Sequence, residues 1–287
     1  MTGNEIVMPE DYQFNLSDFA LFLSVMRNRK AYQNVLSIIM DEPDIQVEEV
    51  KVEPVVLNEF GKRAIRLDAW ARTADKRHFD VEMQNDTRKD DVRKRSRYYQ
   101  SLMDSPVLKA GKKTRYKMLP STVIIFITQE DIFGRDVVKY TFTEQCEEIR
   151  DLKLEDGTTK IFLNMTSKNG APELVSMLQY MKETRIDNPE IVVKDSRLLE
   201  LDEIVNEVKE SKEWEAVKMN ILEIGKEIGK EAGIEIGIEI GERQSLKKLI
   251  EKKLVKGCSA EEIAEMLEIS VEMVQDLITE MKVDTEK

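Results

Sequence analysis

The chain has little of the residue types on which many catalytic and structural sites depend. Its 287 residues include a single histidine and two cysteines, and Cys146 and Cys258 lie far apart in the sequence. These numbers support neither a disulfide framework nor a structural zinc site. A catalytic dyad built on histidine would have to use His78, and we do not favour one. We expect reduced thiols and a cytoplasmic protein.

Long hydrophobic runs are also missing, so we expect no membrane partner. The N-terminal residues, MTGNEIVMPEDYQ, are acidic and do not have the pattern of a signal peptide. Apolar residues make up 41% of the chain, with two Trp, nine Phe and seven Tyr, which is enough for a hydrophobic core. The net charge of −12 argues against a protein coated throughout for nucleic acid.

Positive charge is nevertheless concentrated in one segment. Residues 86–117 carry eleven basic side chains and four acidic ones, a local net charge of +7. A run of this kind is often only the solvated face of a helix. Because this one directly follows a group of carboxylates, we expect it to belong to a site for a polyanion.

Those carboxylates lie in residues 66–84, RLDAWARTADKRHFDVEMQ, which predict a β-hairpin. Apolar residues alternate with polar ones along both strands, as in strands with one buried and one polar face. A three-residue loop at 74–76 would place Asp68 opposite Glu82 and Leu67 opposite Met83. All acids would then share one face, with Ile65, Leu67 and the following alanines on the other, whereas a two-residue loop would separate the acids.

Two carboxylates facing each other on adjacent strands suit Mg²⁺, which prefers oxygen ligands. The backbone carbonyl of Met83 would point near the same place, and Gln84 could hold an attacking water. Gln84 carries no charge, so a cation would have to come from Lys62, Arg66 or an arginine of 88–97. The alternative is an acidic hairpin face that is only solvated surface.

The other segments predict a mixed α/β chain. Residues 14–40 predict two helices, or one helix broken near Asn28, and residues 87–104 predict a helix that Thr87 could cap. The run STVIIFIT at 121–128 predicts a central strand buried on both faces. Further segments predict an extended stretch at 46–57, strands at 136–143 and 160–165, and a helix at 171–183.

From about residue 198 the pattern predicts a long helix or a helix pair. Glycine and glutamate each recur every four residues from 223 to 241. A stripe of small residues lets two helices approach closely, so the segment could join a homodimer through the C-terminal helix; a flexible tether is the alternative. The tail has the shape of a helix-turn-helix with a capping box at Ser259 and Glu262. Its second helix lacks basic residues, which favours protein packing over DNA recognition.

Several motifs, taken as a set, resemble one known family. They are EDYQFNLSDFALF, GKRAIRLDAWA, FDVEMQND, RKRSRYYQSL and STVIIFITQEDIFG. Asp68 and Glu82-x-Gln84 are similar to the D…(E/D)xK signature of the PD-(D/E)XK nuclease superfamily. Over about residues 9–185 the chain most resembles the Rpn family of recombination-promoting nucleases and transposases.

The resemblance implies an α/β (α+β) fold of the PD-(D/E)XK restriction-endonuclease type, with a mixed sheet flanked by helices. It implies Mg²⁺- or Mn²⁺-dependent DNA cleavage with Asp68 and Glu82 as metal ligands, and with Gln84 in the place of the superfamily lysine. Asp11 aligns with an accessory acid, although the Phe-Lys that usually follows reads Phe14-Asn15. We expect a nuclease-like domain at 1–190, a helical Gly-Glu repeat at 191–256 and a helix-turn-helix-like tail at 257–287.

Our leading hypothesis is a magnesium-dependent DNA endonuclease linked to recombination or mobile elements. The second is a nucleic-acid-binding protein on a nuclease scaffold that has lost catalysis, and the third is a protein that oligomerises through its helical tail. In the leading hypothesis the basic segment holds the DNA backbone without reading bases. The residues expected to do so are Arg88, Lys89, Arg93, Arg95, Arg97, Lys112, Lys113 and Arg115.

Overall fold

In the computed structural model, the apolar run at 121–128 forms strand β6 (Thr122–Thr128), and all seven of its residues are buried. It lies inside a six-stranded sheet, between two parallel neighbours, β5 (His78–Gln84) and β8 (Thr158–Asn164). β-Branched and aromatic side chains fit such a position because both faces of the strand are covered. The predicted central strand is confirmed.

The rest of the sheet is antiparallel. Its order is β1-β4-β5-β6-β8-β7, with β1 at Val47–Val52, β4 at Ala69–Thr73 and β7 at Lys139–Phe142. A separate two-stranded sheet pairs β2 (Val55–Val56) with β3 (Ile65–Arg66). The sheet is therefore mixed, as predicted.

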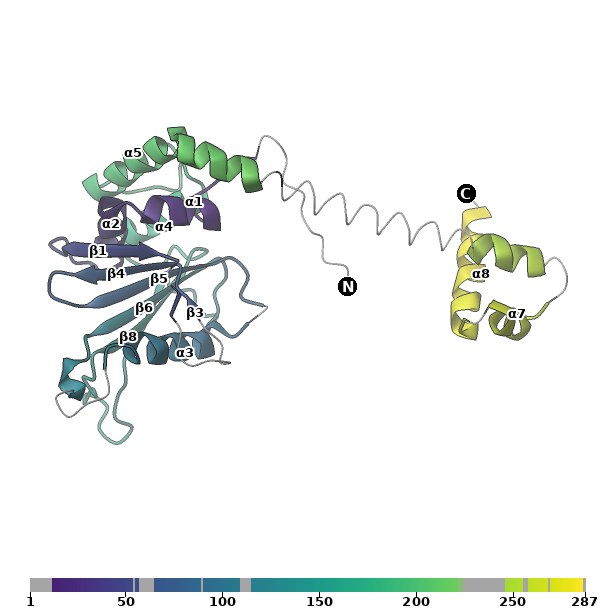
Figure 1. The fold of residues 1–287 in the computed structure, drawn as a ribbon, viewed down its shortest axis with the longest axis horizontal. Coiled ribbons are helices and arrows are strands. Elements are labelled where there is room, and N and C mark those ends of the chain that lie inside the picture. Colours follow the sequence, from purple (N-terminus) through teal and green to yellow (C-terminus); the bar gives the residue numbers. More distant parts are fainter. Residues whose placement is uncertain are drawn as a thin grey trace. The chain divides into compact units, whose positions relative to one another are not determined.

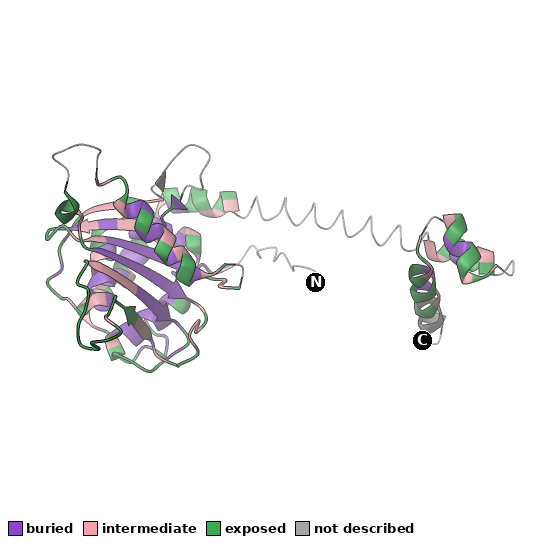
Figure 2. Cartoon of the chain, turned by 90° about the horizontal axis from the view of Figure 1, so that it is seen from below, coloured by how far each residue is buried: buried purple, intermediate pink, exposed green. Residues whose placement is uncertain are grey.

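Helices cover both faces of the large sheet (Figure 1). Among the described helices, only α3 (Val92–Asp104) lies on one of these faces. The opposite face carries α1 (Phe19–Met26), α2 (Arg29–Met40), α4 (Pro172–Lys182) and α5 (Ser196–Glu210). Figure 2 shows burial concentrated in the sheet strands and in the inner sides of these helices.

The structure describes residues 12–53, 55–56, 65–88, 90–108, 115–221, 223, 246–254, 258–267 and 269–285. The chain divides into two units, of which one spans Gln13–Lys218 and contains the sheet. The other contains the C-terminal helices. The domain boundaries at 190 and 256 stay a prediction, and the Gly-Glu repeat lies outside the described residues except for Glu223.

Helix starts follow the capping residues. Of the two alternatives for residues 14–40, the structure has two helices, because the Asn28 side chain accepts hydrogen bonds from the amides of Lys30 and Ala31 and so caps α2. The prediction that Thr87 caps the next helix is wrong. Helix α3 begins later, where the Asp91 side chain accepts from the amides of Arg93 and Lys94.

The C-terminal unit has its own small core. A helical segment at 246–254 packs with α7 (Ala260–Leu267) and α8 (Val271–Thr285) around Ile250, Ile263, Val274 and Leu277. The capping box is confirmed, since the Ser259 amide donates to Glu262 and the Glu262 amide donates to the Ser259 hydroxyl. Within the described residues, no helix is both long enough and apolar enough to span a membrane.

Candidate active site

The hairpin has the predicted register. Strands β4 and β5 are antiparallel, with Ala69 opposite Val81 and Trp70 opposite Asp80. The Thr73 amide donates to the Arg77 carbonyl at 3.0 Å, which closes a three-residue loop at 74–76. The odd loop length keeps the acids of the two strands on the same face.

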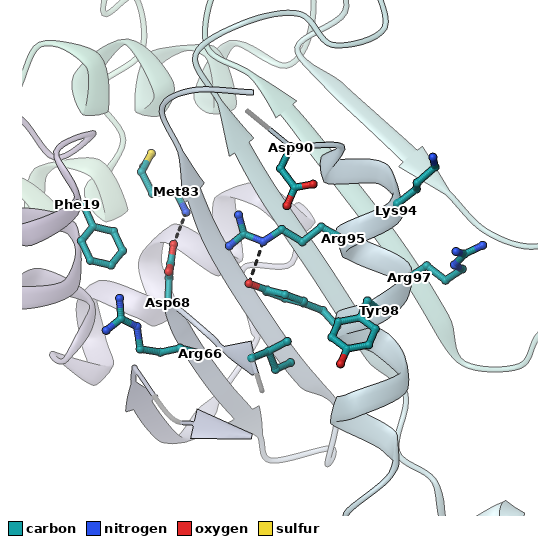
Figure 3. Close-up of a pocket in the computed structure, with 11 residues that line it drawn as sticks. Phe19, Arg66, Asp68, Met83, Asp90, Lys94, Arg95, Arg97 and Tyr98 are labelled. Atoms are coloured by element: carbon teal, nitrogen blue, oxygen red, sulfur yellow. Dashed lines mark hydrogen bonds between the residues drawn. The ribbon is translucent and has the colours of Figure 1, made fainter. Parts of the chain in front are cut away.

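Asp68 and Glu82 are joined through the backbone. The Asp68 amide donates to Glu82 Oε1 at 2.7 Å. The Met83 amide donates to Asp68 Oδ2 at 2.9 Å, the bond drawn in Figure 3. These two bonds hold the carboxylates side by side at the start of β4. The predicted juxtaposition of Asp68, Glu82 and Met83 is therefore present in the structure.

One part of the predicted face pattern is wrong. Ile65 and Leu67 do not share a face with Ala69; they pack beside α3 with Tyr99 and Met103. The alternation breaks because Ile65–Arg66 leaves the large sheet to pair with β2, and the chain bends at Asp68 before β4 begins. The bend turns the apolar residues before Asp68 toward the α3 side of the sheet.

The acidic face is also not exposed, because α3 covers it. Asp68 is 7% exposed, Glu82 is 1% exposed and Asp80 is fully buried. Burial raises the pKa of all three carboxyls, and their mutual repulsion adds to the rise for Asp80 and Glu82. Neither oxygen of Asp80 has a hydrogen-bond partner in the described part of the chain. A solvated acidic surface is therefore excluded.

Arg95 of α3 is the cation that faces these acids. Its Nη2 donates to Glu82 Oε2 at 2.7 Å, its Nη1 to Gln84 Oε1 at 2.6 Å and its Nε to the Tyr99 hydroxyl at 2.8 Å. The guanidinium also lies over the rings of Tyr99 and Phe126, at 4.9 and 5.5 Å from their centroids. Its charge opposes the rise in the pKa of both Asp68 and Glu82.

Gln84 is anchored at both ends of its amide. Oε1 accepts from Arg95, and Nε2 donates to the Asp86 carbonyl at 2.6 Å. With respect to the described residues, one further N–H and one further lone pair of the amide have no partner. The side chain is thus held rigidly beside Glu82.

Asp68, Arg95 and Tyr99 border a cavity of about 690 Å³ between α3 and the hairpin, whereas Glu82 and Gln84 are not among its lining residues. The size is in the range of ligand pockets. Asp68 and Met83 lie on one side of it, and three basic side chains reach it besides Arg95 (Figure 3). The lining consists of Phe19, Ile65, Arg66, Asp68, Met83, Asp90, Lys94, Arg95, Arg97, Tyr98 and Tyr99.

The other cations predicted for DNA contact are dispersed. Arg88 and Arg93 are exposed and pair with Asp86 and Asp91, each at 3.1 Å. Arg97 borders the cavity, and Arg115 is exposed before a short 3-10 turn at Tyr116–Met118. Asp11, Lys62, Lys89, Lys112 and Lys113 lie outside the described residues.

Two positions have a place in the site that the sequence did not assign. The Tyr99 hydroxyl accepts a hydrogen bond from Arg95. The i, i+4 spacing of the two residues on one helix is the signal that could have indicated this contact. Asp80 was placed on the acidic face, but no sequence pattern indicated that both its oxygens would be buried without partners.

The mixed sheet and the paired carboxylates at the end of a β-hairpin define a PD-(D/E)XK nuclease-like protein. The model of one family, described as PD-(D/E)XK nuclease family transposase, matches residues 10–220. The chain belongs to this family, which confirms the resemblance found in the sequence. Nucleases of this superfamily act on DNA and generally use divalent metals. No curated protein and no solved structure matches the chain.

Proposed function

We propose that this protein is a divalent-metal-dependent DNA endonuclease that hydrolyses phosphodiester bonds at Asp68 and Glu82. The observation that carries the proposal is the buried carboxylate pair Asp68 and Glu82, of which Asp68 borders a cavity lined by basic side chains. Buried carboxylates are costly for folding, so a cluster of them is a candidate for function. A role in recombination or in mobile elements is part of the proposal.

The donor set fits a small divalent cation. Among the described residues, no three His, Cys, Asp or Glu side chains gather closely enough to hold a metal by themselves. Mg²⁺ keeps several waters and is commonly bound by only one or two carboxylates, which Asp68 and Glu82 provide. Burial raises the pKa of these carboxyls in the metal-free site, and a divalent ion bound there would favour their ionised forms.

Asp68 and Glu82 would hold the ion, with the Met83 carbonyl as a third oxygen. A bound Mg²⁺ or Mn²⁺ would polarise the phosphodiester and lower the pKa of a water. The free N–H and lone pair of Gln84 would orient the attacking water. Asp11 stays a proposed accessory acid.

The basic segment would hold the DNA backbone. Phosphate contacts made by exposed arginines position a duplex without reading its sequence. Arg88, Arg93, Arg97 and Arg115 are suited to this because they are exposed. Lys89, Lys112 and Lys113 complete the proposed set. With a net charge of −12, the protein would bind DNA through this segment alone.

The test is cleavage of supercoiled plasmid in Mg²⁺, Mn²⁺ or EDTA, with Asp68→Ala and the Asp68→Ala, Glu82→Ala double variant beside the wild type. We expect metal-dependent nicking that both variants lose. Asp151→Ala, which removes an exposed carboxylate from a distant loop, is the matched control and should nick as the wild type does. Unchanged nicking by the folded double variant would contradict the proposal.

The second candidate is a DNA-binding protein without catalysis. It is favoured by Gln84, which has no charge, and by the ion pair between Arg95 and Glu82, which occupies one carboxylate oxygen. DNA binding that needs no divalent metal, with no nicking in any metal by folded wild-type protein, would select this alternative.

A further inference from the structure

In the proposed hydrolysis, position 84 does not provide a positive charge, because it is a glutamine. Negative charge builds up on the phosphate oxygens as water attacks, and a fixed cation beside them lowers the barrier. An amide cannot supply that charge. Among the described residues, Arg66, Lys94, Arg95 and Arg97 border the cavity and could do so.

Arg95 is the cation whose position is fixed by the site itself. Its guanidinium donates hydrogen bonds to Glu82, Gln84 and Tyr99 at 2.6 to 2.8 Å. Stacking on two aromatic rings restricts it further. A charge that is held in place before the reaction costs no reorganisation when the transition state forms.

Arg95 still has donors to offer. A guanidinium carries five N–H groups, and three of them take part in the contacts described, which leaves two. The side chain is 24% exposed and borders the cavity, whereas the Glu82 side chain behind it is 1% exposed. A phosphate that enters the cavity can therefore reach the guanidinium edge.

The other cations are placed less favourably. The Arg66 side chain is 60% exposed and pairs with Glu53 at 3.3 Å. Lys94 and Arg97 project from α3 away from Asp68 (Figure 3). In the described part of the chain, none of these three side chains donates a hydrogen bond to Glu82 or Gln84. They suit the DNA backbone around the site more than the reacting phosphate.

We propose that Arg95 binds the reacting phosphate and supplies the positive charge that Gln84 cannot. This inference rests on the proposed function. The attacking water forms the new P–O bond, the leaving oxygen departs with the electron pair of the broken bond, and protons move through water. Arg95 forms no covalent bond and keeps its proton, because an arginine stays charged at any pH of interest.

The first test measures the single-turnover nicking rate and the salt dependence of DNA affinity for Arg95→Met and Arg95→Lys. We expect Arg95→Met to lose about 100-fold in rate. Loss of one phosphate contact should also reduce the slope of log affinity against log salt by about 1. Arg95→Lys keeps a charge and should retain part of the rate and most of the slope.

The matched control is Arg185→Met, which removes one exposed arginine that follows α4 on the other side of the sheet. It should change neither the rate nor the slope. Thermal unfolding checks that the variants are folded. If Arg95→Met does not fold, Arg95→Lys and Arg95→Gln take its place in both measurements.

A rescue separates catalysis from packing. Gln84→Lys, placed in the Arg95→Met background, puts a cation back beside Glu82 and should restore at least about tenfold of the lost rate. A purely structural Arg95 would not respond to charge at position 84. The inference would be overturned by two results together. Gln84→Lys would not restore the nicking rate, and folded Arg95→Met would have the same salt slope as the wild type.

The two proposals fail separately. The wild type could bind DNA without nicking it in any metal, while Arg95→Met still lowers the slope of log affinity against log salt. The proposed hydrolytic function would then be wrong, and the proposed contact between Arg95 and a phosphate would stand. If the wild type nicks DNA and Arg95→Met has the same nicking rate and the same salt slope, the proposed nuclease function stands and the proposed role of Arg95 is wrong. A wild type that does not bind DNA overturns both.

Discussion

Asp80 is the side chain whose burial is hardest to explain by folding alone. It lies two residues before Glu82, opposite Trp70, and both its oxygens lack partners in the described part of the chain. Burial, followed by the charges of Glu82 and Asp68, raises its pKa. The folded state therefore favours the neutral carboxyl, and stability is lost as the pH rises above the ordinary value for aspartate.

We predict that Asp80→Asn stabilises the metal-free protein at pH 8 by about 1–3 kcal/mol. The amide stays neutral and can donate to Glu82. The gain should shrink at pH 4, where Asp80 folds as a neutral acid. Urea unfolding in EDTA at both pH values measures this, with the exposed Asp151→Asn as the control. An equal gain at both pH values would contradict the explanation.

The same carboxyls connect the binding of a metal ion to the thermal stability of the folded protein. Since burial raises the pKa of Asp68, Asp80 and Glu82, the folded apoprotein holds protons that the unfolded chain releases above about pH 4. We predict that the melting temperature in EDTA falls from pH 7 to pH 9. Millimolar Mn²⁺ or Mg²⁺ should raise it again at pH 9 by several degrees, because binding to the folded state stabilises it.

Thermal melts of the wild type and of the Asp68→Ala, Glu82→Ala variant provide the comparison. The variant should show a smaller fall with pH and little response to metal. His78 contributes little to the change, because burial lowers its pKa and the window lies above the ordinary histidine value. A metal response of equal size in both proteins would place the ion elsewhere.

At the scale of elements, the hairpin loop determines how the acids face each other. Lys76 has φ of 67°, in the left-handed region that favours glycine, and its amide donates to the Thr73 carbonyl at 2.8 Å. A lysine there costs roughly 1–2 kcal/mol in backbone strain. The register depends on this turn because its three residues keep the spacing odd.

We predict that Lys76→Gly raises the free energy of unfolding by about 1 kcal/mol, since glycine adopts this conformation without strain. Lys76→Ala keeps the Cβ atom and is the control; it should change stability by less than about 0.5 kcal/mol. Chemical denaturation of the three proteins measures the effect. Equal stabilisation by alanine and glycine would mean that the side chain, and not the backbone, is responsible.

At the scale of the whole chain, the unit with the sheet has a core of its own. It extends beyond α5, because Trp214 is 3% exposed and packs edge-on against Phe14 with ring centroids 5.2 Å apart. The described site residues all lie inside this unit. The C-terminal helices have a separate core.

We predict that a shortened chain ending at Lys218 keeps its cooperative melting transition and its DNA nicking, and sediments as a monomer. The full chain should sediment as a dimer if its C-terminal helix joins two copies. A chain ending at residue 200 is the comparison and should be destabilised, because it lacks Trp214 and most of α5. A dimer formed by the chain ending at Lys218 would place the interface in the nuclease-like unit.

Local patterns in the sequence were sufficient to predict the central strand of the sheet and the pairing of Asp68 with Glu82. The uninterrupted apolar run predicted a strand buried on both faces, and strict alternation with an odd loop placed Asp68 beside Glu82. These features depend on near neighbours and on the period of side chains along a strand, which a sequence displays directly. The motif set was also enough to identify the family.

Only the tertiary structure decided what covers the acids. Helix α3 packs on their face, so a pattern that suggested solvent exposure became a buried site, and Arg95 was singled out from the neighbouring basic residues. The bend before β4 that moved Leu67 to the α3 side arose from pairing between β2 and β3. Such outcomes depend on contacts between segments distant in the sequence, and local periodicity carries no information about them.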